Sequence, residues 1–268
     1  MVASTERRNE DYPWHEFDPE TYLADNYAVL RDEDRQMVEL VRDFFAQQFA
    51  DNPARTGRRG IDVGTGTNLY PALAMLPFVD RLTLYDYSPA NIAWLARQRA
   101  AHWPSWTGVW SRFWRILSER PSYAHLDGHA RAELARCVDV IRGSVFDLDS
   151  NGQRWDVGTM FFVAESITQR REEFTAAVNH FINALRPDSP FAVAFMEDSR
   201  GYEVAGRSYP STPVSCAEVW RCLRSRAYDV TVERVDVGDE PLRAGYSGTI
   251  VACGRTGPPV PPEVTSEC

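Results

Sequence analysis

Short apolar runs alternate along this chain with longer stretches in which apolar residues recur at helical spacing. The runs predict buried strands over residues 60–63, 81–85, 138–145, 157–163 and 191–195. The longer stretches predict helices over residues 17–50, 68–77, 89–102, 171–185 and 215–227. Two last apolar stretches, 229–237 and 247–253, predict a closing strand pair that resembles an antiparallel one. Strands alternating with helices indicate an open α/β sheet with its ligand at the carboxyl ends of the strands.

The same pattern indicates a single domain with a segment at each end and a helical insertion. Residues 1–16 are polar and are predicted to be mobile, and the proline-rich tail, 255–268, is predicted to be disordered. The domain itself spans 17–254. Within it we expect a helical lid over 17–55 and a helical insertion over 103–136, where tryptophans fall at helical spacing.

Composition narrows the class of protein. The chain has 268 residues and a formal net charge of −9, which argues against nucleic acid as the main partner. No window approaches ~18 consecutive apolar residues, so we expect no membrane span. The polar first residues carry no apolar segment of a secretory signal, and we therefore expect a cytoplasmic protein. All 29 basic residues are arginine, which excludes a Schiff-base or phosphate-loop lysine and suggests a bacterial origin in secondary metabolism.

Metal binding is not indicated. The five cysteines form no C-x-x-C pair, and we expect reduced thiols. His125 and His129 lie four residues apart, but Gly128 weakens a helix there and no third ligand is evident.

A glycine turn carries the sharpest chemical signal. Gly64 and Gly66 follow the first strand and allow the backbone to approach a ligand closely. The third glycine of a dinucleotide fingerprint is missing near Leu69, which speaks against a nicotinamide dehydrogenase. Asp86 comes 20 residues after Gly66, where an acid can accept hydrogen bonds from ribose hydroxyls, and Asp62 adds negative charge before the turn. This pattern favours S-adenosylmethionine, a cationic nucleoside without phosphate.

Three segments in order, DPETYLADNY, IDVGTGTNLYPAL and LTLYDYSPANI, resemble the family of nicotinamide, phenylethanolamine and indolethylamine (thioether) N-methyltransferases. The resemblance spans roughly residues 17–254. It implies a Rossmann-like, class I methyltransferase fold, with a seven-stranded, mostly parallel sheet whose last strand is antiparallel. It also implies S-adenosyl-L-methionine as cofactor and S-adenosyl-L-homocysteine as product.

The resemblance further implies which residues contact the cofactor. Tyrosines would close over its methionine end, the glycine turn would lie under the amino acid moiety, and the acid after the second strand would bind the ribose. In VIRGSVF, a serine stands where the family has an aspartate at the adenine, and its hydrogen bond would be weaker. The implied contacts are Tyr22, Tyr27, Asp62, Gly64, Thr65, Gly66, Tyr70, Asp86, Tyr87, Ser88, Asn91, Ser144 and Val145.

Methyl transfer from a sulfonium is an in-line displacement that needs alignment and, for an amine acceptor, removal of a proton. Glu165 stands where the phenylethanolamine branch has an active-site glutamate, and Glu197 and Asp198 follow the strand at the substrate mouth. Trp14, Trp106 and Tyr202 are the expected substrate-binding aromatic residues.

We therefore expect a metal-free methyltransferase acting on a nitrogen of a small molecule, as a monomer or weak homodimer. An O-methyltransferase and a non-catalytic homologue that only binds the cofactor remain alternatives.

Overall fold

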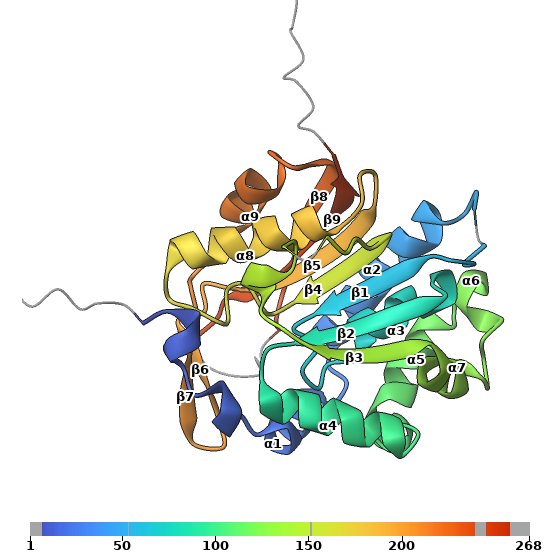
Figure 1. Ribbon diagram of the computed structural model, residues 1–268, viewed down its shortest axis with the longest axis horizontal. Helices are drawn as coiled ribbons and strands as arrows, with labels where there is room; N and C mark the ends of the chain where they lie inside the picture. The colour runs from blue at the N-terminus through green and yellow to red at the C-terminus, as the bar shows by residue number, and fades with distance from the viewer. Residues whose placement is uncertain (1–6, 53, 151, 239–244, 258–268) are drawn as a thin grey trace, which may run out of the picture.

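The computed structural model describes residues 7–52, 54–150, 152–238 and 245–257. In this part of the chain, seven strands form one sheet in the order β3-β2-β1-β4-β5-β9-β8 (Figure 1). The strands β1 to β5 pair in parallel, and β9 is antiparallel to both of its neighbours. The strands are β1 (Arg59–Val63), β2 (Arg81–Asp86), β3 (Val138–Arg142), β4 (Val157–Phe161), β5 (Pro190–Glu197), β8 (Ala227–Val235) and β9 (Gly248–Thr256). The predicted mostly parallel sheet with a reversed last strand is confirmed.

Helices cover both faces of the sheet. On one face, α2, α3, α4, α5 and α7 bury a common apolar cluster against it, and α8 and α9 pack on the other face (Figure 1). The helices are α1 (Pro19–Tyr27), α2 (Asp32–Gln48), α3 (Tyr70–Met75), α4 (Pro89–Ala100), α5 (Ser111–Leu117), α6 (Pro121–Ala124), α7 (Ala130–Cys137), α8 (Arg171–Ala184) and α9 (Cys216–Leu223). This layering leaves the carboxyl edge of the parallel strands for a ligand.

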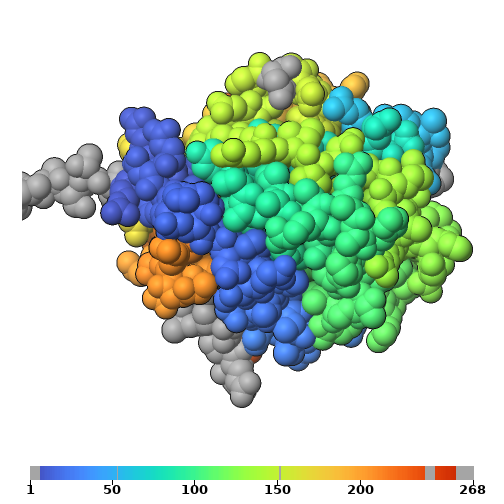
Figure 2. Space-filling model, turned by 60° about the horizontal axis from the view of Figure 1, so that its bottom comes forward, coloured from blue at the N-terminus to red at the C-terminus, as the bar shows by residue number. Residues whose placement is uncertain are grey.

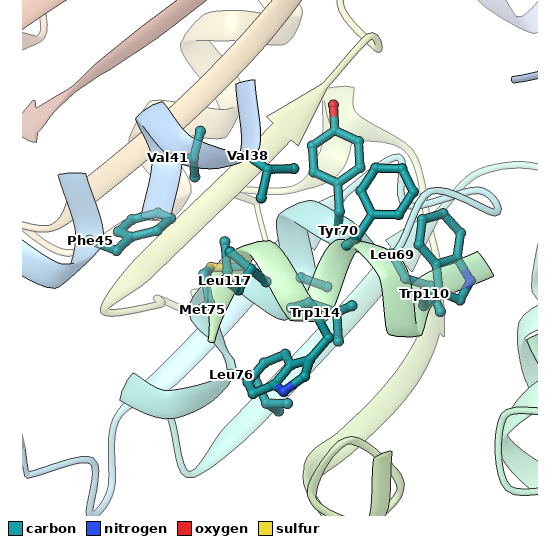
Figure 3. Packing of buried hydrophobic residues seen from close by; sticks show 14 of the residues in the cluster. Val38, Val41, Phe45, Leu69, Tyr70, Met75, Leu76, Trp110, Trp114 and Leu117 are labelled. Atoms are coloured by element: carbon teal, nitrogen blue, oxygen red, sulfur yellow. The ribbon is translucent and has the colours of Figure 1, made fainter. Parts of the chain in front are cut away.

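The central strands are apolar because both of their faces are buried. Leu82 and Leu84 of β2 face the α2 side, whereas Ile61 and Val63 of β1 face the α8 side. Each fully buried side chain of this size contributes about 1.5–3 kcal/mol of transfer free energy. Figure 3 shows Val38, Val41 and Phe45 of α2 lying against the layer that contains Tyr70, Met75 and Leu117.

The insertion packs as core. Trp103 and Trp110 are fully buried, and a single π-helical turn, Trp106–Trp110, leads into α5. No helix in the described residues is long and apolar enough to cross a membrane.

The N-terminal segment is arranged against a hairpin that the sequence pattern did not predict. The hairpin pairs β6 (Gly201–Val204) with β7 (Arg207–Pro210). Trp14 stacks on Tyr209 with ring centroids 5.3 Å apart, and the N-terminal segment and the hairpin lie side by side in Figure 2.

The two chain ends also differ in part from the expected boundaries. Residues 9–11 and 14–16, expected to be mobile, form short 3₁₀ helices, because the Trp14 ring has a buried aromatic site to enter. The expected tail, 255–268, begins two residues too early, since β9 continues to Thr256. Residues 1–6 and 258–268 lie outside the described residues.

Candidate active site

A cavity lies at the carboxyl ends of β1, β2, β3 and β4, under the N-terminal segment and the β6–β7 hairpin. We call it the first cavity, and it encloses about 790 Å³ with its open mouth included. Its lining comes from the loops after these strands and from the aromatic residues above them. The lining includes Trp14, Phe17, Tyr22, Tyr27, Gly64, Thr65, Gly66, Asn68, Tyr85, Asp86, Tyr87, Ser88, Asn91, Gly143, Val145, Phe162, Ser166 and Tyr202.

The floor is the glycine turn after β1. Gly64 has a φ of 66°, and a Cβ there would lie 2.3 Å from the Val163 side chain. Gly66 has a φ of 49°, and its N–H donates to Asp86 Oδ2 at 2.8 Å. Both positions therefore require glycine, and the turn presents backbone to the cavity.

Asp86 ends β2 and is held by three donors. Besides Gly66 N–H, Ser88 N–H donates to Oδ1 at 2.8 Å, and Asn91 Nδ2 lies 3.2 and 3.3 Å from the two oxygens. Burial raises the pKa of Asp86, and these hydrogen bonds oppose that rise. The carboxylate is thus fixed at the cavity wall, where it can accept hydrogen bonds from a diol.

Two neighbouring polar residues differ in what they can do. Asp62 lies in β1 under the turn, outside the lining, and its Oδ1 accepts from Thr159 Oγ1 at 2.7 Å. Burial raises the pKa of Asp62 to about 7. Asn68, in contrast, lines the cavity, where its side chain interacts with the Tyr70 hydroxyl and its amide oxygen has no partner among the described residues. A buried amide oxygen of this kind can accept a hydrogen bond from a polar ligand group.

Two of the predicted tyrosines line the first cavity, and the third lies behind them. Tyr22 and Tyr27 line the cavity, with ring centroids 6.1 Å apart. Tyr70 lies one layer deeper, outside the lining, and stacks on Phe113 at 5.3 Å. Burial raises the pKa of Tyr27 well above its usual range, so its ring meets the cavity as a neutral phenol.

At the opposite end of the cavity, Val145, Tyr85 and Tyr87 contribute to the wall. Ser144 lies outside the lining, because its Oγ accepts from Phe146 N–H at 3.2 Å and caps the short helix that follows. The Tyr85 hydroxyl donates to the Ser144 carbonyl at 3.1 Å.

A second cavity, of about 510 Å³ with its mouth included, adjoins the first. The two share five lining residues, most of them aromatic, and on the far side the second is walled by the start of α2 and the end of β5. The shared residues are Tyr22, Tyr27, Phe162, Ser166 and Tyr202, and the others are Asn26, Arg31, Glu33, Asp34, Met37, Met196 and Thr249.

The three predicted catalytic carboxylates lie outside both linings. Glu165 is fully buried, and its Oε1 accepts from Met196 N–H and from Ser166 Oγ, each at 3.0 Å. It therefore holds two residues that do line the second cavity. Glu197 and Asp198 lie further along, at the end of β5.

Both of these acids are occupied by polar neighbours. Glu197 Oε2 accepts from Arg234 Nε at 2.6 Å and from Ser247 Oγ at 3.0 Å. Asp198 Oδ2 accepts from the same hydroxyl at 2.9 Å. The strand end thus turns its acids toward β8 and the segment before β9 rather than toward the cavities.

The three aromatic residues predicted to bind substrate do not lie at one site. Trp14 and Tyr202 both line the first cavity. Trp106 tilts against Trp114 at 6.1 Å in the insertion and borders another hollow, which shares no residue with the first two cavities.

Several residues of these walls were not singled out from the sequence, among them Phe162, Asn68, Glu33 and Asp34. Phe162 has a φ of 59°, an unusual conformation for a bulky residue that sequence patterns do not reveal. Asn68 follows the glycine turn and could have been noted from its position. Glu33 and Asp34 fall in the first helical turn of α2, where acids are common for reasons of helix stability alone.

The fold and the strand-end cavity define a Rossmann-like, S-adenosylmethionine-dependent methyltransferase. The chain aligns with phenylethanolamine N-methyltransferase from Rattus norvegicus at 25% identity over 246 residues, which cover 87% of this chain and 84% of that protein. The Macaca mulatta enzyme of the same name is 23% identical over 243 residues, 87% of this chain and 85% of that one. The N-methyltransferase NodS from Bradyrhizobium japonicum WM9, solved with S-adenosyl-L-homocysteine, superposes with a TM-score of 0.52 at 12% identity, over 89% of this chain and 99% of that one.

The model of the NNMT/PNMT/TEMT family matches residues 6–244. The chain belongs to this family, and the predicted family, enzyme class and cofactor are confirmed.

Proposed function

We propose that this enzyme methylates a nitrogen, of an amine or an aromatic ring, on a small molecule. One observation carries the proposal: the cavity at the strand ends adjoins, along a shared and mostly aromatic wall, a second cavity lined by carboxylates. The two-cavity arrangement suits two reactants that meet at that wall.

The residues of the first cavity fit the cofactor by chemical type. Asp86 would accept hydrogen bonds from the ribose diol, and the Asn68 amide would pair with the amino acid end. Val145 and Tyr87 would border the adenine. Since Ser144 Oγ is already engaged by Phe146 N–H, we do not assign it the adenine amine.

When bound, the cofactor supplies a methyl group already activated by its sulfonium. The chain's own contribution is to orient and to exclude water. Tyr22 and Tyr27 present aromatic rings to both cavities, where a cation is attracted to their faces. Trp14 and the hairpin cover the first cavity, and we assign them a lid role in addition to the lid expected over residues 17–55.

The relatives support nitrogen as the acceptor. The aligned relatives from Rattus norvegicus and Macaca mulatta carry the name phenylethanolamine N-methyltransferase. We assign Glu165 a positioning role, through Ser166 and Met196, and give Glu197 and Asp198 no contact with the acceptor.

A methyl-labelled donor tests the proposal. Purified protein is incubated with labelled S-adenosylmethionine and a panel of aromatic amines, N-heterocycles, phenols and alcohols, and labelled products are separated from the donor. We expect label on nitrogen of at least one compound. Label found on oxygen alone would show an O-methyltransferase, and binding of the donor without any labelled product would show a non-catalytic homologue.

A further inference from the structure

We propose that Asp34, at the start of α2, binds the protonated amine of the methyl acceptor in the second cavity and accepts its proton. This inference rests on the proposed N-methylation. It assigns the proton acceptor to the helical N-terminal region, rather than to the strand-end carboxylates that the family resemblance indicates.

The position of Asp34 carries the first step. It lines the second cavity together with Tyr22 and Tyr27, the two tyrosines that also line the first cavity. A group bound beside Asp34 is therefore next to the wall where the two cavities meet. Of the three predicted catalytic carboxylates, none lies in this lining, as described above.

The hydrogen bonds of Asp34 carry the second step. The residue is buried, with 6% of its surface exposed, and Asp34 Oδ2 accepts from Arg31 N–H at 3.1 Å. Within the described residues, no donor reaches Oδ1 and no guanidinium lies within ion-pair distance of the carboxylate. Burying an unpaired carboxylate is costly, and a cationic ligand offsets this cost.

Charged groups of both signs lie around Asp34: Arg31 opposes the rise of its pKa, whereas Glu33 adds to that rise. Arg31 lines the cavity, but its Nε has no hydrogen-bond partner in the described residues, and Glu33 is engaged by the Tyr246 hydroxyl at 3.2 Å. Tyr27 and Tyr70 also face Asp34, and both remain neutral. Burial raises the pKa of Asp34 to about 7, which suits a group that exchanges a proton near neutral pH.

The chemical step balances with these groups. The N–H bond of the ammonium breaks and its proton passes to Asp34 Oδ1, which leaves the lone pair on nitrogen. That lone pair forms the new bond to the methyl carbon as the bond between that carbon and sulfur breaks, and the bonding electrons remain on sulfur. The proton on Asp34 then leaves to solvent, so no further reactant is needed.

A purely structural role is the alternative, because Asp34 also caps α2 through Arg31 N–H. Asp34→Asn separates the two roles, since the amide oxygen still accepts the capping hydrogen bond while the charge is lost. Asp32→Asn is the matched control: it makes the same change two residues earlier, on an exposed side chain of the same helical turn.

The experiment measures charge preference in protein loaded with S-adenosylhomocysteine, by calorimetry near pH ~8, where Asp34 is ionised. The probes are benzylamine, 2-phenylethylamine and tryptamine, each compared with the alcohol that has a hydroxyl in place of the amine. We expect at least one amine to bind roughly tenfold or more tightly than its alcohol, as a charged hydrogen bond provides. Asp34→Asn should abolish this preference, and Asp32→Asn should keep it.

Two results would overturn the inference: a preference that survives in Asp34→Asn, or no preference for any amine in the unmodified protein. Melting temperatures check that the variants fold, and Asp34→Ser replaces Asp34→Asn if the latter does not. The labelled-methyl assay reads the proposed function separately. Label on nitrogen with an unchanged preference would refute only Asp34, whereas a lost preference without labelled amine would refute only N-methylation.

Discussion

The Ser88 hydroxyl donates a hydrogen bond to the backbone carbonyl of Trp14 at 2.7 Å, across 74 positions of sequence. The same oxygen accepts from Asn91 N–H at 3.3 Å and so caps α4. One side chain therefore joins the N-terminal segment to the turn that carries Asp86, and the cover of the first cavity is tied to its acidic wall.

Ser88→Ala should weaken both connections. Loss of a serine N-cap costs about 1 kcal/mol of stability. We expect a lower melting temperature and a several-fold weaker affinity for S-adenosylmethionine, measured by calorimetry. Ser225→Ala is the control, because that exposed hydroxyl bonds only to a neighbouring turn. Equal effects of the two substitutions would contradict the link.

Asp86→Ala should weaken S-adenosylmethionine binding by ~1.5–3 kcal/mol, the usual contribution of hydrogen bonds to a charged group. The substitution also frees the N–H groups of Gly66 and Ser88, which now point at the carboxylate. Calorimetric titration measures the change. Asp139→Ala, toward the amino end of the neighbouring strand β3 and paired with Thr83 rather than Asp86, should leave the affinity unaltered. An unchanged affinity in the Asp86 variant would refute the ribose assignment.

Much of the fold could be predicted because both faces of the central strands are apolar. The short apolar runs around Ile61 and Leu84 are typical of strands in a parallel sheet that is buried on both faces. The β6–β7 hairpin was missed because its aromatic residues, Tyr202 and Tyr209, pack mainly on each other and on a distant segment rather than on the sheet. The local pattern of apolar and polar residues does not indicate a packing partner that is distant in the sequence.

The residues of the candidate site also fall into two groups: those that depend on local backbone could be predicted from the sequence, and those that depend on distant packing could not. Gly64, Gly66 and Asp86 act through the local backbone, so their spacing could be interpreted directly. Asp34 differs, because only the packing of α2 beside Tyr27 brings its carboxylate to the second cavity. In the sequence it is one of three acids in a helical first turn, a pattern with a sufficient local explanation.

Asp62 should make the protein less stable as pH rises. Burial raises the pKa of Asp62 to about 7 in the folded state from its ordinary value of 3.8, so between these values the folded protein holds a proton that the unfolded chain has released. The contribution of Asp62 to stability is therefore greatest below pH ~4, falls up to pH ~7 and is then constant.

Asp62→Asn should reduce this slope, because the amide oxygen can still accept from Thr159 Oγ1 while no charge is buried at high pH. Chemical denaturation across the pH range measures it. Asp34, whose pKa is also raised to about 7, contributes a slope of the same sign, so the double variant with Asp34→Asn should be flatter still. A slope that is unchanged in Asp62→Asn would show that its carboxyl is ionised throughout.

Trp14 provides the last prediction, on the cover of the first cavity. Its indole lies between Phe17 and Tyr209, with centroids 6.5 and 5.3 Å away, and its Nε1–H donates to the Asn9 carbonyl at 2.8 Å. Trp14→Ala removes this anchor, and the loss of a buried tryptophan costs about 3–5 kcal/mol where the surroundings are rigid. Since Trp14 packs in a small aromatic cluster separate from the two clusters on the sheet, we expect the loss to appear in cofactor retention more than in global stability.

The dissociation rate of S-adenosylhomocysteine should therefore rise by at least roughly tenfold in Trp14→Ala, because water reaches the cavity and the tyrosine wall loses its cover. Stopped-flow displacement measures this rate. Trp220→Ala is the matched control, since that indole is 43% exposed on α9 and lies outside the first cavity. A dissociation rate that changes equally in both variants would assign Trp14 to packing alone, whereas a selective increase would identify residues 7–17 as the part of the chain that retains the cofactor.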